Sequence, residues 1–444
     1  MSDREHFAKH FTALEHLAFA APRMAMSLLV MSYLVVDGVL VARFVGMTGL
    51  SAVSMTFPIT SAMMAVGVMI AAGCGAVAAR RLGARNRAGA LEAFSTALSS
   101  TFLGGGVLGG TVLAFLPDVC ELIGMTQSQT ALALDYQGVL LCATGFFLLN
   151  FVFQSFFTVA GRPKAGLVAA AAVGVLNIAL DILFMGPMQL GIRGAALATV
   201  SAWVLGAVIG FWYFMRPDSP MRPAVRLPHL PTLVTACGNG LQEFIGNLAV
   251  VATVWVYNRT FMAHLGVDGV AALAVCTFAA YVFNACYHGF CEATGPIVGF
   301  KYGAKDFRDL RSFVIQSTIL AALISVSAFV LAVLLGDSVL RFFSSDEGAA
   351  LALARENFPV FSLSLLILCL NMLAGYFFSA VGDGRRAALI AFCRASGFSI
   401  AAVLLLPRWL GDLGLWLAGS AAEAATLLVA AVLLWFERRR WGFG

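Results

Sequence analysis

Residues 216–231 read RPDSPMRPAVRLPHLP and hold five prolines and three arginines. Proline lacks a backbone N–H and breaks helices, so this stretch cannot form a membrane-spanning helix. Long apolar stretches lie on both sides of it. The segment is therefore predicted to be a cytoplasmic linker between two units, residues 1–215 and residues 232–444.

The two sides of the linker match each other at one constant offset. One match pairs LGARN at 82–86 with YGAKD at 302–306, and another pairs GLSA at 49–52 with GVAA at 269–272. A third pairs Leu190, Gly191 and Gly194 with Leu410, Gly411 and Gly414. Three matches in the same register indicate an internal duplication.

The composition indicates an integral membrane protein. Of the 444 residues, 60% are hydrophobic and only 11% are charged, whereas a soluble domain carries roughly 25% charged residues. Twelve apolar stretches are long enough to cross a bilayer. Spans are helical unless apolar and polar residues alternate with a period of two, as in a β-barrel, and these stretches show no such alternation. The sequence predicts an all-α fold of twelve spans in two six-helix halves, at 14–45, 51–79, 91–117, 129–158, 165–187, 192–215, 232–261, 268–298, 310–336, 355–380, 386–407 and 413–436.

The distribution of Lys and Arg predicts the orientation. With both termini in the cytoplasm, 20 of the 28 basic residues fall on the inner side, as cytoplasmic loops require. These residues form short clusters between apolar segments, which argues against nucleic-acid binding. We expect a multi-pass protein of the bacterial inner membrane. Six spans per half is an even number, so the halves insert the same way up, as in secondary transporters whose substrate path lies between two parallel repeats.

Polar side chains inside the predicted spans of the first half share one depth. A helical rise of about 1.5 Å per residue places them roughly 10–14 Å below the outer surface. Charged groups at this depth are costly and call for a partner or a task. Carboxylate, amide and hydroxyl oxygens suit hard cations, and close carboxylates favour protonation of one of them. The sequence predicts a site for Na⁺ or H⁺ formed by Asp37, Tyr136, Asn177, Asp181 and Thr199, with Na⁺ assigned to Asp37, Asn177, Asp181 and Thr199.

The second half carries a different polar set at an inner-half depth. Glu243, Glu292 and Arg394 fall inside the seventh, eighth and eleventh spans, and Asn247 and Asn371 could line the same cavity. One interpretation is a buried, charge-compensating Arg–Glu contact within this half. The other is a second protonation or substrate site that faces the cytoplasm. His288 is predicted to be a packed interior residue.

Several of these segments resemble one transporter family. GVLNIALDILFMG at 174–186, followed by LGIRGAALATVSAW at 190–203, is similar to the fifth-to-sixth-span signature of the multidrug and toxic compound extrusion (MATE) transporters. VDGVLVARFVGMTGLSAVSMTFPI at 36–59 and GPIVGFKYGAKD at 295–306 resemble other segments of that family. The resemblance implies V-shaped lobes and export of organic cations or amphipathic compounds against Na⁺ or H⁺, with no other cofactor.

The resemblance also implies site residues. It assigns the cation site to the same five residues of the first half and adds Gln154 in the fourth span. Glu292 stands where Gln is expected, which leaves the role of the second half open. We expect a monomer with small-molecule substrates and the lipid bilayer as partners.

Three other classes of function are alternatives. A flippase for lipid-linked oligosaccharides or their precursors would need several basic residues in its cavity, whereas Arg23 and Arg394 are the intramembrane cations found. A membrane enzyme would need a catalytic constellation, and no HExxH, GxSxG or GxxxxGK[ST] motif occurs. A channel fits two repeated lobes poorly, because no symmetric pore loop is evident.

Overall fold

The computed structural model describes residues 7–122, 124–219, 221–224, 226–343 and 348–437. In this described part, nine helices are long and apolar enough to span a membrane, or 11 when each of two bent helix pairs counts as one span. The 74-residue helix α10 (Leu230–Gly303) holds two arms that meet at Gly266, where φ is 65°. Counting both arms gives the twelve spans that the sequence predicts.

The first half contains six spans built from seven long helices and one short one. The fourth span bends by 56° between α6 and α7. In chain order the elements are α2 (Ala13–Phe44), α3 (Met47–Gly83), α4 (Arg87–Ala114), α5 (Leu116–Leu122), α6 (Gln127–Cys142), α7 (Thr144–Val159), α8 (Pro163–Met185) and α9 (Gly191–Met215).

The second half follows the same order. The two arms of α10 are the first two spans of this half. Helix α10 begins at Leu230, and Pro231 fits there because proline is tolerated in the first turn of a helix. The fourth span of this half bends by 48° between α12 and α13. The remaining elements are α11 (Phe307–Phe343), α12 (Ala349–Ser362), α13 (Leu365–Val381), α14 (Gly384–Phe392), the π-helical turn η1 (Cys393–Gly397), α15 (Phe398–Leu405), α16 (Pro407–Leu410) and α17 (Asp412–Glu437).

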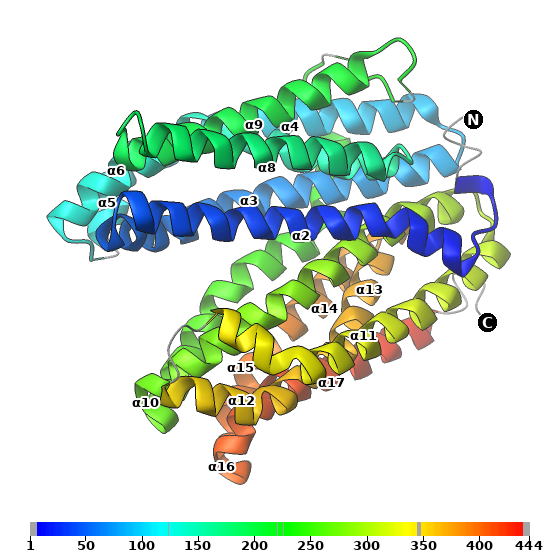
Figure 1. Cartoon of the computed structure of the whole chain (residues 1–444). Coiled ribbons are helices and arrows are strands. Elements are labelled where there is room, and N and C mark those ends of the chain that lie inside the picture. Colours follow the sequence, from blue (N-terminus) through cyan, green and yellow to red (C-terminus); the bar gives the residue numbers. More distant parts are fainter. Residues whose placement is uncertain (1–6, 123, 220, 225, 344–347, 438–444) are drawn as a thin grey trace.

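The two halves form the arms of a V (Figure 1). Helices α2–α9 make the upper arm in this view, and α10–α17 make the lower arm. The arms diverge toward the end that carries α5 and α16 and converge at the end where both termini lie. At the convergent end, α2 and α3 pack against α10, and α3 also contacts α13.

The internal duplication is visible in the backbone. Residues with positive φ recur at positions that the repeat makes equivalent. The pairs are Gly46 (95°) and Gly266 (65°), Arg85 (62°) and Lys305 (59°), and Gly191 (58°) and Gly411 (59°). The bend after α6 falls at Ala143, and the bend after α12 begins at Leu363. Each of these pairs keeps the offset of the sequence matches, so both halves share one local geometry as well as one sequence pattern.

The halves approach closely at two glycines that the repeat makes equivalent. A Cβ atom on Gly83 would lie 2.0 Å from the carbonyl oxygen of Phe300, and one on Gly303 would lie 2.0 Å from that of Arg80. Arg80 and Phe300 are themselves equivalent positions of the repeat. The ends of α3 and α10 therefore cross through reciprocal backbone contacts that only glycine permits.

A cluster of polar groups holds this crossing from one side. We call it the Arg81 cluster, and it contains Arg81, Glu92, His229 and Thr232. Arg81 Nη1 lies 3.0 Å from Glu92 Oε1, and Thr232 Oγ1 donates to the same oxygen at 2.7 Å. His229 Nδ1 lies 3.2 Å from it. The ion pair of the first half thus binds the segment that leads into the first span of the second half.

An equivalent cluster lies on the other side. We call it the Lys301 cluster, and it contains Lys9, His10, Lys301 and Asp309. Lys301 pairs with Asp309 and donates to the carbonyl oxygen of Lys9 at 3.2 Å, while His10 Nδ1 lies 2.6 Å from Asp309 Oδ1. Here the ion pair of the second half binds the segment that leads into the first span of the first half.

Each first helix also begins in the apolar core of the opposite half. Phe11 packs on Phe313 with ring centroids 5.9 Å apart, and buried His16 lies 2.9 Å from Thr294 Oγ1. In return, Ala236 of α10 belongs to the buried core of the first half. The convergent end is therefore a sealed and interlocked region.

Candidate functional site

The carboxyl groups of Asp37 and Asp181 meet in the first half. Asp37 lies on α2 and Asp181 on α8, and these two helices pack along each other. Their carboxyl groups lie close enough to interact electrostatically with one another. Asp181 is fully buried, and among the described residues neither of its oxygens, nor Oδ1 of Asp37, has a hydrogen-bond partner.

Two acids this close together can share a proton or hold a small cation between them. Ionised carboxyl groups have only hydrogen-bond acceptors. Two of them close together therefore repel, and neither can donate a hydrogen bond to the other. A shared proton supplies the missing donor, and a small cation supplies the missing charge. The pair is thus chemically suited to bind H⁺ or Na⁺.

Two further predicted residues lie beside this pair. Tyr136 on α6 is 7% exposed and interacts electrostatically with both aspartates. Asn177 on α8 is 3% exposed and lies one helical turn before Asp181. An amide and a phenol therefore stand beside the carboxyl groups, as the shared depth predicts.

In the part of the chain that the structure describes, the side chains of Gln154 and Thr199 form no hydrogen bond with Asp37 or Asp181. Sequence reasoning missed Tyr33, which interacts with Asp37 and packs against α8, where a Cβ on Gly174 would lie 3.2 Å from its ring. Its position one turn before Asp37 was the available signal.

The second half holds a cavity of about 530 Å³. Four of the five residues predicted for a second polar site line it: Glu243, Asn247, Asn371 and Arg394. Glu423 on α17 also lines it and was missed, although an acid in the middle of the twelfth span was a signal in the sequence. His288 faces this cavity as well, 3.5 Å from the hydroxyl of Tyr376.

Glu292 has a different environment from the other four. It forms an ion pair with Arg23, in which Nη2 and Oε2 are 2.5 Å apart, and Nε donates to the same oxygen at 2.8 Å. Arg23 belongs to α2, so this pair joins the two halves. Among the described residues Arg394 forms no ion pair with Glu243 or Glu292, and the Arg–Glu contact within the second half involves another acid. Arg394 instead lies 4.0 Å from Glu423.

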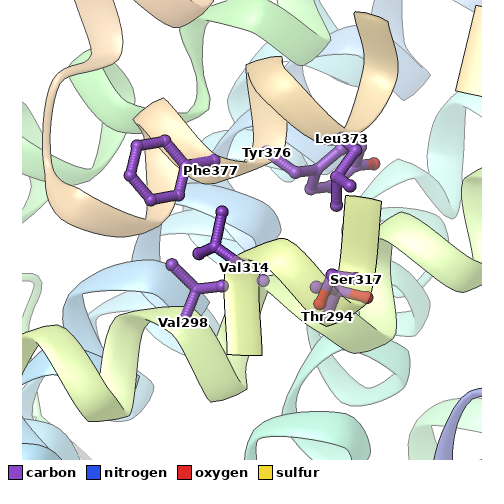
Figure 2. A pocket seen from close by; sticks show the side chains of 8 residues that line it. Thr294, Val298, Val314, Ser317, Leu373, Tyr376 and Phe377 are labelled. Carbon is purple, nitrogen blue, oxygen red and sulfur yellow. The ribbon is translucent and has the colours of Figure 1, made fainter. Parts of the chain in front are cut away.

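Near the crossing, the interior of the second half is closely packed. Figure 2 shows a small pocket between α10, α11 and α13, where Thr294 and Ser317 lie close together below Tyr376 and Leu373. Its volume is about 10 Å³, which is room for one water molecule at most. The space that can hold an organic molecule thus lies farther from the convergent end.

Comparison with known proteins places the chain in a family. The MatE family model matches residues 22–183 and 248–404, which is most of both halves. The multidrug export protein MepA of Staphylococcus aureus (strain NCTC 8325 / PS 47) is 25% identical over 443 residues, covering 97% of this chain and 94% of MepA. MepA of Staphylococcus saprophyticus is 25% identical over 435 residues, covering 95% and 93%.

Solved structures show the same fold. An outward-facing multidrug resistance MATE family transporter of the MOP superfamily has a TM-score of 0.91 at 20% identity, covering 100% of this chain and 98% of that one. A MOP superfamily transporter from Pyrococcus furiosus has a TM-score of 0.89 at 20% identity with the same coverage. These matches confirm the resemblance found in the sequence motifs. Because its family model covers more than half of the residues, the chain belongs to the MatE family of membrane transporters.

Proposed function

We propose that the chain is an efflux pump that exports organic cations and other amphipathic compounds in exchange for Na⁺ or H⁺. The observation that carries the proposal is the proximity of Asp37 and Asp181, which interact electrostatically and whose buried oxygens lack donors among the described residues. Relatives named multidrug export proteins along nearly the whole chain support the export of drugs.

The coupling follows from the state of the two carboxyl groups. With an ion or proton between them, α2 and α8 can pack as observed. Without it, two like charges repel in a region of low dielectric and favour another packing of the helices. The ion drives export only through its different affinities for these two arrangements.

The orientation of the V gives this state a direction. The arms diverge at the end opposite the termini (Figure 1), and the distribution of basic residues predicts cytoplasmic termini. We infer that this arrangement is an outward-open state in a bacterial plasma membrane and that the coupling ion reaches the carboxyl pair from outside. We expect the protein to act as a monomer.

The test uses purified protein in proteoliposomes loaded with rhodamine 123, a cationic dye. A Na⁺ gradient and a pH gradient are imposed separately, and dye movement is followed by fluorescence. We expect one gradient to drive transport in the wild type and to fail in both Asp37→Asn and Asp181→Asn. Asp118→Asn, at an exposed position of α5, is the matched control and keeps transport. Wild-type transport in both site variants would refute the assignment.

A further inference from the structure

We propose that the ion pair of Arg23 with Glu292 is a lock that holds the two halves together near the convergent end and must open before they can separate there. Arg23 lies on α2 of the first half, and Glu292 lies on the second arm of α10. The inference concerns the balance between two arrangements of the halves. It therefore goes beyond the proposed function and does not depend on which ion or compound is transported.

The pair forms where the backbones of the two halves touch. Arg23 Nη2 lies 2.5 Å from Glu292 Oε2, and Nε donates to the same oxygen at 2.8 Å, with the two side chains 8% and 23% exposed. One helical turn before Glu292, a Cβ atom on Gly289 would lie 2.9 Å from the carbonyl carbon of Arg23. Because α2 and α10 meet so closely at this point, the halves cannot part here without separating the two charges.

Neither the duplicated fold nor the family resemblance requires this pair. The repeat makes Arg23 equivalent to Glu243 and Glu292 equivalent to Ala72, so the matching positions at the crossing of α3 with the first arm of α10 cannot form an ion pair. The resemblance in the sequence expects Gln in place of Glu292, and Gln carries no charge to pair with arginine. The lock is therefore a property of this chain's own residues and lies at one of two otherwise similar crossings.

A small polar chamber lies beside the pair and is lined by residues of both halves. Its volume of about 50 Å³ gives room for several water molecules. Three hydroxyl groups line it, and each donates to a backbone carbonyl oxygen, which leaves its lone pairs open to water or to arginine: Ser155, Thr158 and Ser379. These surroundings lower the cost of separating the two charges, which suits a lock that opens better than a permanent link.

Loss of one partner should favour the arrangement in which the halves are apart. A buried charge without its partner is strongly unfavourable, and separation of the halves would bring that charge to water. Arg23 cannot lose its proton, so Glu292→Gln leaves a full positive charge behind. Arg23→Gln leaves a carboxyl group, which a proton can neutralise. We therefore expect Glu292→Gln to open the halves more than Arg23→Gln does.

The competing explanation is that the pair only stabilises the folded chain. Two buried cysteines distinguish the explanations. Cys74 is fully buried on α3 and packs in one core with Ala236 of α10, so it becomes accessible when the halves part. Cys120 is fully buried in α5, at the end where the arms diverge (Figure 1), and becomes accessible only when the first half itself unfolds.

The experiment measures the rate of maleimide labelling at both cysteines in purified full-length protein in lipid nanodiscs, by mass spectrometry. We expect Glu292→Gln to raise the rate at Cys74 by about tenfold to a hundredfold, and Arg23→Gln to raise it less, with Cys120 unchanged. The exchanged pair, Arg23→Glu with Glu292→Arg, should return the rate close to that of the wild type. Asp337→Asn is the matched control, because the ion pair of Asp337 with Arg355 lies within the second half, and it should change neither rate.

Three outcomes would overturn the inference. A Cys74 rate in Glu292→Gln equal to that in Asp337→Asn would show that the pair does not hold the halves. A parallel rise at Cys74 and Cys120 would show a loss of stability alone. An exchanged pair that labels as fast as Glu292→Gln would show that the two charges act separately.

A milder variant keeps the inference testable if neither single variant folds. Glu292→Asp retains the charge but shortens the side chain by one methylene group, and it should raise the Cys74 rate by about two- to tenfold. An unchanged rate in this variant would also overturn the inference. No ion gradient or transported compound enters the measurement, so its result is independent of the test of the proposed function.

Discussion

A methyl group at the crossing of α3 and α10 should shift the protein toward a state in which the halves separate there. In Gly83→Ala, the new Cβ would stand 2.0 Å from the carbonyl oxygen of Phe300. A carbon and an oxygen atom normally approach no closer than about 3.3 Å. The two helices would have to part by more than about 1 Å, which the packed interior resists.

The magnitude follows from measured costs of overpacking. Forcing one methyl group into a close-packed contact costs about 1–3 kcal/mol, and 1.4 kcal/mol is a factor of about ten in an equilibrium. The population with the crossing open should therefore rise about 5- to 150-fold. Gly303→Ala should act alike because its contact is reciprocal. The double variant should cost less than the sum, since one separation relieves both clashes.

Cys74 provides the measurement. It is fully buried on α3 and packs in one core with Ala236 of α10. Its rate of maleimide labelling, followed by mass spectrometry, should rise with the open population, while that of Cys120, buried far from the crossing, should not change. Gly104→Ala is the control, because nothing lies within 4 Å of a Cβ there. If Gly83→Ala labels like Gly104→Ala, the crossing is not a closed contact and the reasoning fails.

Three other predictions follow from the same structure. Replacing Arg23 or Glu292 alone by Leu should destabilise the protein by about 3–5 kcal/mol, because it leaves a buried charge, and the double variant should recover part of the loss in thermal unfolding. Thr253→Val should cost about 1–3 kcal/mol by freeing the carbonyl of Ala395, whereas Thr260→Val, whose hydroxyl bonds only within α10, should cost less. Saturating Na⁺ or acid should raise the melting temperature of the wild type, as a ligand of the native state does, and this rise should vanish in Asp181→Asn. If a variant does not differ from its control in these measurements, the corresponding prediction is wrong.

The sequence alone predicts much of the fold because its signals are local. Prolines at 216–231 mark the linker, apolar length marks the spans, and matches at one constant offset mark the duplication. The proximity of Asp37 and Asp181 could also be anticipated, since the rise per residue places both at one depth. Depth was sufficient here because α2 and α8 run side by side within one half.

Depth alone does not predict a contact that depends on the rotation of a helix about its axis or on which half of the protein the side chain faces. Glu292 shares its depth with Glu243 and Arg394, yet it faces Arg23 on the other half. Glu423 is visible as an intramembrane acid, but only the packing of α17 against α13 brings it beside Asn371. The π turn at Arg394 could not be predicted, because one hydroxyl that bonds its carbonyl oxygens belongs to Thr253, which is far away in the sequence.

The Arg81 and Lys301 clusters bear on how the chain could have arisen. Each half presents an acid–base pair that receives the entry segment of the other, so the surfaces are complementary in both directions. Six spans per half also insert the same way up. An ancestral half could thus have docked with a second copy of itself through a two-fold axis, making both contacts at once. Two halves expressed as separate polypeptides should still associate in the bilayer. The proline-rich segment between them would then be dispensable for their assembly.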